Sequence, residues 1–283
     1  MQIGIFAKTF NRPNVEDVFD AIMSNGLNQT QFNMACAGLE SVPNYIDPSL
    51  ADRIRAASDK NGVTIAALSG TFNMIHPNIE ERKIGLKRLD VLAASCSRIG
   101  TSIITLCTGS RNGNSMWKKH HDNDTSEAWH DLCATMCEAL RIAQDHQITL
   151  AIESEVSNVV DSAIKARRLL DEMKSPNLKV IMDGANLFHV GEGKFMAAIL
   201  DEAFELLGSD IVLAHAKDLA SDSEDPEFVA AGKGILDYDN YLKHLKASKY
   251  DGALIIHGLS EEQVPESVQF IRKQLNLLSE KEY

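Results

Sequence analysis

Four residues that can bind a metal ion or transfer a proton each stand at the end of a short apolar run. They are Glu153 in TLAIE, Asp183 in KVIMD, His215 in IVLAH and His257 in ALIIH. Runs this apolar are typical of parallel strands that are covered on both faces. Because the carboxyl ends of parallel strands meet at one rim of a barrel, we expect these side chains to converge there.

Each residue also has an ordinary structural explanation, since Glu153 can cap a helix, Asp183 can shape a turn and His215 can be a hydrogen-bonded core histidine. Together, however, two carboxylates and two imidazoles form a set that can hold one divalent metal ion. We therefore predict Glu153, Asp183, His215 and His257 as metal ligands. The mixed oxygen and nitrogen donors suit Mn, Zn, Co or Mg, and the sequence does not distinguish among these metals.

A metal at this rim would hold the carbonyl and the adjacent hydroxyl of a sugar. It would thereby lower the cost of removing a proton from the carbon beside the carbonyl. Glu153 is then the expected catalytic base, and His257 is either a ligand or a second catalytic acid/base. This is the chemistry of an aldose–ketose isomerase or a ketose epimerase.

The elements that would position these residues alternate regularly between strand and helix. Eight strand-like runs lie at residues 3–7, 30–33, 63–68, 103–107, 149–153, 179–183, 211–215 and 253–257. Segments with apolar residues at helical spacing follow them, and this alternation predicts a single (β/α)8 barrel domain over residues 1–283. A doubly wound open sheet is disfavoured, because Ala7-Lys8-Thr9 stands where its Gly-rich turn would follow the first strand.

Three further candidates for substrate contact come from the segments that follow strands. His76 lies in the loop SGTFNMIHPN, where a surface role and a substrate contact are equally open, and Arg111 lies in the long loop TGSRNGNSMWKKHHDND. Lys217 stands just beyond His215 at the predicted rim. If the sugar carries a phosphate, the candidates to bind it are Arg111, Lys118 or Lys119, and the Gly232-Lys233-Gly234 segment. Arg111 is preferred, because Lys118 and Lys119 are better explained as solvated residues of a basic loop.

Composition limits the partners and the compartment. The 283 residues include 28 Lys and Arg against 40 Asp and Glu, a net charge of -12, which disfavours nucleic acid as a partner. The 5 cysteines lack CxxC spacing and are expected to be reduced. With no signal-like segment at residue 1 and no apolar stretch of about 18 residues, we expect a cytoplasmic protein without membrane insertion.

The strand-end sequences IESE, MDGANLF, AHAKD and ALIIHGL resemble the xylose isomerase-like barrel superfamily of sugar and sugar-phosphate isomerases and epimerases. The resemblance spans nearly the whole chain and is best marked over residues 149–218. It implies that Glu153, Asp183 and His215 are metal ligands and that Glu153 also serves as an acid/base. The family's epimerases place a glutamate on strand eight as fourth ligand and second acid/base, whereas this chain has His257. Many members also have a histidine where this chain has Asn186, which we interpret as a contact to a substrate hydroxyl.

The leading hypothesis is a metal-dependent isomerase or epimerase acting on a small-molecule sugar or sugar phosphate. One alternative is dehydration of a polyol-derived ketone at the same metal site, and another is a non-catalytic sugar-binding barrel. A phosphodiesterase resembling the superfamily's abasic-site endonucleases is the least favoured, because it needs a basic DNA track. Whether the chain forms a homo-oligomer is left open.

Overall fold

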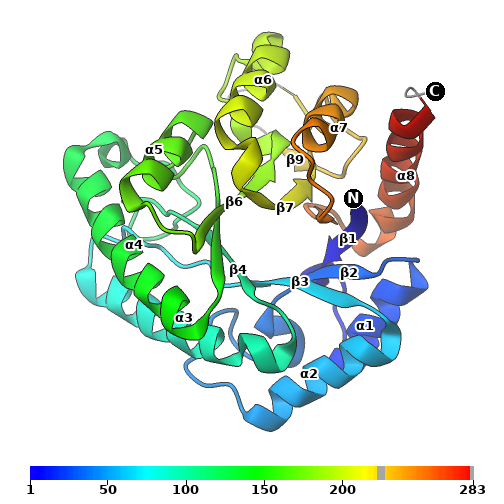
Figure 1. The fold of residues 1–283 in the computed structure, drawn as a ribbon, viewed down its shortest axis with the longest axis horizontal. Coiled ribbons are helices and arrows are strands. Elements are labelled where there is room, and N and C mark those ends of the chain that lie inside the picture. Colours follow the sequence, from blue (N-terminus) through cyan, green and yellow to red (C-terminus); the bar gives the residue numbers. More distant parts are fainter. Residues whose placement is uncertain (222–226, 281–283) are drawn as a thin grey trace.

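Eight parallel strands close into a barrel in the computed structural model, which describes residues 1–221 and 227–280 (Figure 1). Around the barrel the order is β1-β2-β3-β4-β5-β6-β7-β10. The strands are β1 (Gln2–Phe6), β2 (Gln29–Phe32), β3 (Thr64–Ser69), β4 (Ile103–Cys107), β5 (Thr149–Glu153), β6 (Leu178–Asp183), β7 (Ile211–Ala216) and β10 (Ala253–Ile256). The predicted (β/α)8 barrel is confirmed.

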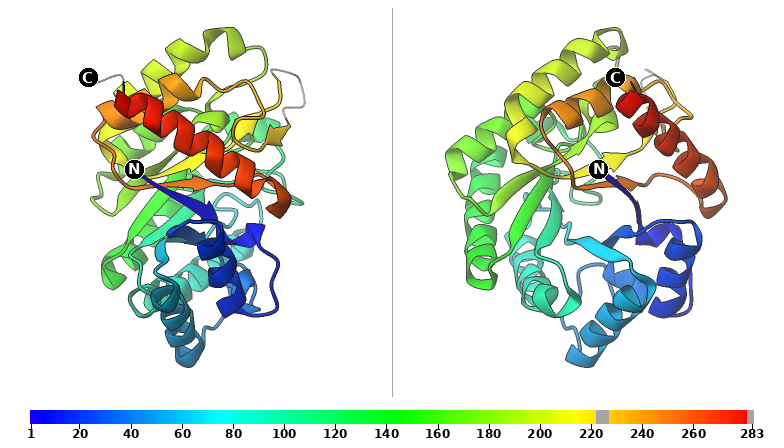
Figure 2. Two further views of the ribbon diagram at one scale, coloured as in Figure 1. Left: turned by 90° about the vertical axis from the view of Figure 1, so that its right-hand side faces the viewer. Right: turned by 45° about the vertical axis from the view of Figure 1, so that its right-hand side comes forward.

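Helices surround the barrel, as the views in Figure 2 show from two further sides. They are α1 (Val15–Ser24), α2 (Pro48–Asn61), α3 (Ile79–Ile99), α4 (Ser126–His146), α5 (Ala163–Met173), α6 (Met196–Leu207), α7 (Tyr238–Ala247) and α8 (Val264–Glu280). Local sequence sets their ends: Asn14 and Thr125 cap α1 and α4 through their side chains, and Gly62 and Gly100 close α2 and α3 with positive φ.

Two layers of apolar residues hold the barrel together. A large layer fills the space between strands and helices, and a smaller cluster lies inside the barrel. The inner cluster consists of Ala67, Ala151, Ile181, Leu213, Ala253 and Ile255. On the neighbouring strand, Gly4 leaves no room for a larger residue, since a Cβ there would lie 2.6 Å from Ile255 Cδ1. The barrel interior is thus packed beneath its carboxyl-terminal rim.

A small antiparallel hairpin interrupts the repeat after β7. It pairs β8 (Asp218–Leu219) with β9 (Phe228–Val229) and was not predicted from the sequence. The hairpin stands at the carboxyl end of β7, so it places Phe228 beside residues of the rim.

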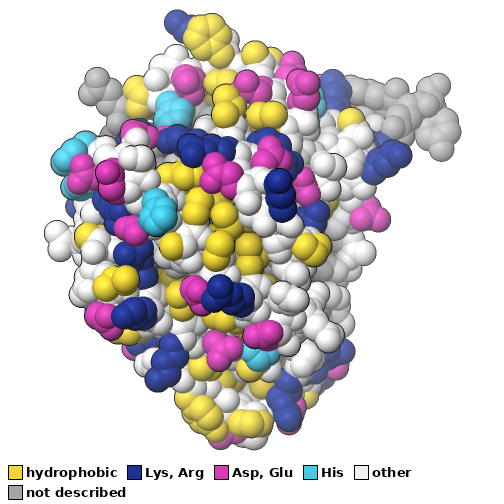
Figure 3. All heavy atoms as spheres, turned by 60° about the vertical axis from the view of Figure 1, so that its left-hand side comes forward, with side chains coloured by type: hydrophobic (Ala, Val, Ile, Leu, Met, Phe, Trp, Pro, Cys, Tyr) yellow, Lys and Arg dark blue, Asp and Glu magenta, His cyan; other side chains and the backbone are white. Residues whose placement is uncertain are grey.

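The outer surface carries both signs of charge. Figure 3 shows Lys and Arg side chains interspersed with Asp and Glu on one outer face. Ion pairs between neighbouring elements include Arg53 with Glu16 and Arg98 with Asp52. Within the described residues, no helix is both long enough and apolar enough to cross a bilayer.

Candidate metal and substrate site

Glu153, Asp183, His215 and His257 converge at the carboxyl-terminal rim, as predicted from their strand ends. One ligand atom of each lies within 4.8 Å of those of the other three. Strand register explains the convergence, because Asp183 on β6 pairs directly with His215 on β7. His257 follows β10 and its amide donates to the carbonyl of Ala216 on β7.

Glu153 presents its two carboxylate oxygens to different neighbours. Oε1 accepts a hydrogen bond from Asn186 Nδ2 at 2.7 Å and lies 3.2 Å from His215 Nδ1. The Cys107 thiol lies 4.0 Å from Oε2, which is a weak contact. One oxygen is therefore held in place while the other stays available to a ligand.

Gln31 on β2 fixes the tautomer of His215. Its amide nitrogen donates to the hydroxyls of Ser69 and Thr105 at 3.1 and 3.2 Å, so its carbonyl oxygen faces His215 Nε2 at 2.7 Å. An amide oxygen only accepts, so Nε2 carries a proton and Nδ1 points at Glu153 and Asp183. A histidine held in this way is a typical metal ligand.

The electrostatics of His215 and Asp183 reflect their close contact. Burial works to lower the pKa of His215, but the charges of Glu153 and Asp183 outweigh it and raise that pKa to about 9. For Asp183, burial works to raise the pKa, but Lys217 and the two histidines hold it well below its usual range. The cluster thus favours positive charge at the place where its ligand atoms meet.

His257 stands beside Asp183 and remains partly accessible. Its Nε2 lies 3.1 Å from Asp183 Oδ2, and its ring contacts that of His215 edge-on at a centroid distance of 4.4 Å. Burial and the neighbouring positive charge of His215 lower the pKa of His257. A neutral imidazole at neutral pH is the form that binds a metal or accepts a proton.

Lys217 is held by its surroundings. Its ammonium lies 3.3 Å from Asp183 Oδ2 and 3.7 Å from the centroid of the Phe228 ring. The hydroxyl of Tyr238 donates to its backbone carbonyl at 2.9 Å. The β8–β9 hairpin and α7 therefore both help to position this cation.

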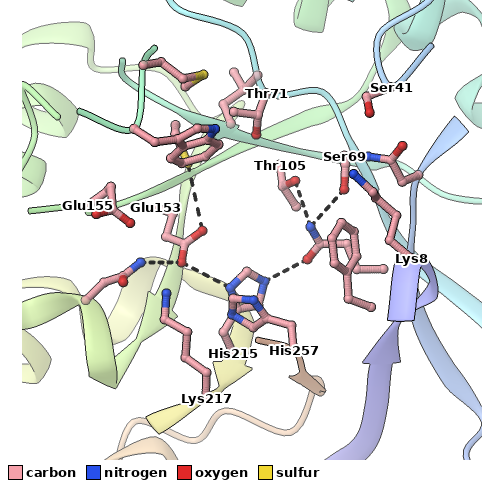
Figure 4. A pocket seen from close by; sticks show the side chains of 18 residues that line it. Lys8, Ser41, Ser69, Thr71, Thr105, Glu153, Glu155, His215, Lys217 and His257 are labelled. Carbon is pink, nitrogen blue, oxygen red and sulfur yellow. Dashed lines mark hydrogen bonds and ion pairs between the residues drawn. The ribbon is translucent and has the colours of Figure 1, made fainter. Parts of the chain in front are cut away.

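The cluster opens into a pocket of about 360 Å³, shown in Figure 4. That volume suits a small molecule. Asn186, Lys217, Glu153, His215 and His257 all line the pocket. Lys8, Ser41 and Thr71 also line the pocket and were not predicted from the sequence as site residues. Their signal is a polar residue at or just after a strand end, which many surface residues share.

The structure does not bring His76 and Arg111 into this pocket. His76 accepts from the Asn78 amide at 3.1 Å and lies 3.2 Å from the Gly113 carbonyl, in a neighbouring surface depression. Arg111 pairs with Asp131 at 2.6 Å and donates to the Ile75 carbonyl at 3.2 Å. Both side chains tie loops together on the same side of the barrel.

The Gly232-Lys233-Gly234 segment already faces an anion of the chain itself. The carboxylate of Asp218 accepts from the amides of Gly232 and Gly234 at 3.1 and 3.0 Å. Lys233 pairs with Glu266. Arg111 and this segment, both candidates for binding a substrate phosphate, are therefore already engaged with groups of the chain itself.

The donor set fits a divalent metal ion. Two buried carboxylates and two imidazoles supply hard and borderline ligands, and Gln31 holds one imidazole in the ligating tautomer. A second group, His120, His121 and Asp122, also meets the distance requirement but lies on the outer loop and is more exposed.

Comparison with known proteins places this arrangement in context. Residues 19–274 match the family described as xylose isomerase-like TIM barrel. Over 162 residues the chain is 25% identical to the uncharacterized protein MJ1311 of Methanocaldococcus jannaschii, covering 56% of this chain and 53% of that one. The chain thus spans about half the length of this curated relative.

Several solved structures share the fold. A D-tagatose 3-epimerase-like protein superposes with a TM-score of 0.79 at 17% identity over 100% of both chains. The 3-keto-D-glucoside 4-epimerase YcjR of E. coli gives a TM-score of 0.72 at 17% identity over 96% of this chain and 99% of its own. The IOLI protein with a zinc atom gives 0.74 at 14% identity over 99% of each chain. At such identities the likeness concerns the fold.

Proposed function

Because the chain belongs to the xylose isomerase-like TIM barrel family, we propose that it is a divalent-metal-dependent isomerase or epimerase of a small sugar or sugar phosphate. The observation that carries the proposal is the convergence of Glu153, Asp183, His215 and His257. All of them except the buried Asp183 line the pocket. The similar structures of a D-tagatose 3-epimerase-like protein and of a 3-keto-D-glucoside 4-epimerase support the choice of substrate class.

The four converging residues would hold the metal. When bound, the ion supplies Lewis-acid stabilisation of negative charge on a substrate oxygen. The protein contributes the positions of the ligands, which Gln31 and Asn186 orient through hydrogen bonds to His215 and Glu153.

Glu153 is the proposed base. Its Oε2 accepts the proton as the carbon–hydrogen bond beside the carbonyl breaks. The electron pair of that bond forms a carbon–carbon double bond to the carbonyl carbon, and the π pair of the carbonyl moves onto its oxygen. Asn186 holds Oε1 meanwhile, so the carboxylate keeps one orientation. In an isomerase the same carboxyl group can return the proton to the neighbouring carbon.

An epimerase needs a second group that returns the proton from the opposite face. His257 is the candidate. It follows β10, whereas Glu153 lies on β5, and strands β6 and β7 stand between these two strands in the barrel. Its lowered pKa leaves it neutral at neutral pH, so it must first gain a proton before donating one.

The test is proton exchange in Glu153→Gln. The amide keeps the shape of the side chain but cannot act as base, so we expect solvent deuterium incorporation into a bound ketose to fall by roughly 10²-fold or more. Nuclear magnetic resonance of ketoses incubated in D₂O with added Mn²⁺-loaded or Zn²⁺-loaded protein, after removal of the ion, provides the readout.

Ser126→Ala, an exposed change on α4, is the matched control and should exchange like wild type. Exchange at the wild-type rate in Glu153→Gln would assign the base to another residue. Dehydration is the second candidate function, favoured by His257 at the position where the resemblance predicts a glutamate, and release of water from the ketone would identify it. Sugar binding without exchange or dehydration would indicate a binding protein.

A further inference from the structure

Lys8 is a cation at the pocket whose ammonium has no partner within the part of the chain that the structure describes. It follows β1 in a short 3-10 turn (Ala7–Thr9) and lines the same cavity as Glu153 and His215. Among residues 1–221 and 227–280 its ammonium makes no ion pair or hydrogen bond, whereas Lys217, the other lysine lining the pocket, is held by Asp183. Lys8 is exposed, so a ligand entering the pocket can reach it.

Two further donors on the pocket wall are also uncommitted. Asn33 is 5% exposed and its side-chain oxygen accepts from the Ala35 amide at 3.0 Å, which leaves its NH₂ group without a partner in the described chain. The Asn33 side chain lines the pocket, so this NH₂ group can donate to a ligand or to water. The hydroxyl of Ser41 likewise has no bond within the described residues, and both side chains line the pocket.

These donors lie away from the carboxylates of the site. Figure 4 shows Lys8 and Ser41 on the side of the pocket opposite to Glu153, Glu155 and Lys217. An ammonium, an amide NH₂ and a hydroxyl together are suited to an oxyanion. A neutral sugar would leave the ammonium without a counter-charge.

Three other basic residues already have protein partners. Arg111 pairs with Asp131, and Arg88 pairs with Glu40 at 3.0 Å. Lys233 pairs with Glu266, and its flanking amides bind Asp218. Lys8 is therefore better placed to bind a substrate anion than any of these three.

We propose that Lys8, Asn33 and Ser41 form an oxyanion-binding subsite, so that the substrate carries a carboxylate or phosphate at the end remote from the metal ligands. This inference rests on the proposed function, because it names the class of sugar on which that reaction acts. A sugar acid and a sugar phosphate share the chemistry that these donors recognise, and the experiment separates them.

The experiment is calorimetric titration of the Mn²⁺-loaded protein with D-fructose, D-fructose 6-phosphate and D-fructuronate. At least one anionic sugar should bind about tenfold or more tightly than D-fructose, as expected for a charge-assisted hydrogen bond. Which of the two binds tighter identifies the anion. The preference should shrink as salt is raised from about 0.05 to 0.5 M, because Lys8 is exposed.

Variants assign the effect to Lys8. Lys8→Met should remove the anionic preference while leaving the affinity for D-fructose unchanged, and Lys8→Arg should retain most of it. Lys119→Met is the control, since Lys119 is exposed in the loop between β4 and α4 and does not line the pocket. Equal thermal midpoints would show that all variants fold.

The outcomes separate this inference from the proposed reaction. Preference for the anion in wild type that persists in Lys8→Met, or equal affinity of wild type for all three sugars, overturns the subsite. If no sugar binds, the protein is titrated with inorganic phosphate. Phosphate binding that is lost in Lys8→Met supports the anion site and counts against the sugar reaction. If phosphate does not bind, or binds equally well to Lys8→Met, the subsite is overturned. Anion preference without deuterium exchange supports the subsite and rejects the reaction.

Discussion

Gln31 shows how a single uncharged residue can determine the chemistry of the site. Its carbonyl oxygen lies 2.7 Å from His215 Nε2 and its amide donates to two hydroxyls of the neighbouring strands β3 and β4. With Nε2 protonated, Nδ1 is the nitrogen that faces the place where the carboxylates meet, and it can bind a metal once it has released its own proton. A positioning residue that never touches the metal is therefore expected to affect metal affinity.

We predict that Gln31→Leu weakens Mn²⁺ or Zn²⁺ binding by about 10-fold to 100-fold, as loss of such an outer contact does. His215→Ala should weaken it at least as much, because it removes the ligand itself. Competition with a fluorescent chelator measures both affinities.

Gln29→Leu is the matched control, since Gln29 lies on the same strand but its side chain bonds Gln2. Unchanged metal affinity in Gln31→Leu, with a loss in His215→Ala, would show that His215 keeps its ligating tautomer without help. Unchanged affinity in both would remove the metal from this rim.

The ligands themselves could be predicted from sequence because each ends a strand, and strand ends in a parallel barrel meet at one rim. Gln31 could not be assigned, since its role depends on the rotation of an amide between three side chains on other strands. Arg111 illustrates the opposite limit: its loop was placed correctly at the rim side, but its partner Asp131 lies on α4 and no local pattern reveals the pair.

Helix α7 connects the two central strands of the site. The Tyr241 hydroxyl lies 2.9 Å from the carbonyl of Met182, the residue before Asp183. It also lies 3.0 Å from the carbonyl of the ligand His215. Tyr241 is fully buried. The helix thus fixes the relative positions of the ends of β6 and β7.

Removing the Tyr241 hydroxyl should weaken the contact that holds the ends of β6 and β7 together. We predict that Tyr241→Phe lowers the free energy of unfolding by about 1–3 kcal/mol, since two buried carbonyls lose a hydrogen-bond partner. Metal affinity should fall as well, because the spacing of Asp183 and His215 is less fixed. Urea denaturation and metal titration measure the two effects.

Tyr250→Phe is the control for a partly buried tyrosine whose hydroxyl does not bond the carbonyl of a metal ligand or of the residue before one. Its hydroxyl lies 2.7 Å from the Ala253 carbonyl at the start of β10, so its loss should cost stability without changing metal affinity. Equal metal affinity in Tyr241→Phe and wild type would show that the strand register alone positions the ligands.

Element prediction succeeded where the apolar pattern was regular. Strands β5 and β6 end at the predicted residues because Glu153 and Asp183 interrupt continuous apolar runs. The β8–β9 hairpin was missed, because its strands have two residues each and show no periodicity. Its consequence for function, the placement of Phe228 against Lys217, was therefore also beyond the sequence.

At the scale of the whole molecule, ion pairs link successive strand–helix units of the barrel, although the protein is acidic with a net charge of -12. Asp210, which precedes β7, pairs with Lys179 on β6 at 2.6 Å and with Arg167 on α5 at 2.9 Å. Burial works to raise the pKa of Asp210, but the two cations outweigh it and lower that pKa. Such an arrangement links the folding of neighbouring units to pH.

Because the pKa of Asp210 is lower in the folded than in the unfolded chain, its charge stabilises the protein above the unfolded value of about 3.9, and that contribution is lost as pH falls through the folded value. At pH 7 we predict that Asp210→Asn lowers the thermal midpoint by roughly 2–4 °C for each 1 kcal/mol lost. The difference in thermal midpoint from wild type should shrink below about pH 4, where the carboxyl of the wild type also becomes protonated.

Asp20→Asn is the control. Asp20 is an exposed residue of α1 with no ion pair among the described residues, so calorimetry of this variant should show no such trend with pH. If the thermal midpoint of Asp210→Asn lies below that of wild type by the same amount from pH 7 to pH 3, the lost stability comes from packing. The ion pairs of Asp210 would then not make the stability of the barrel depend on pH.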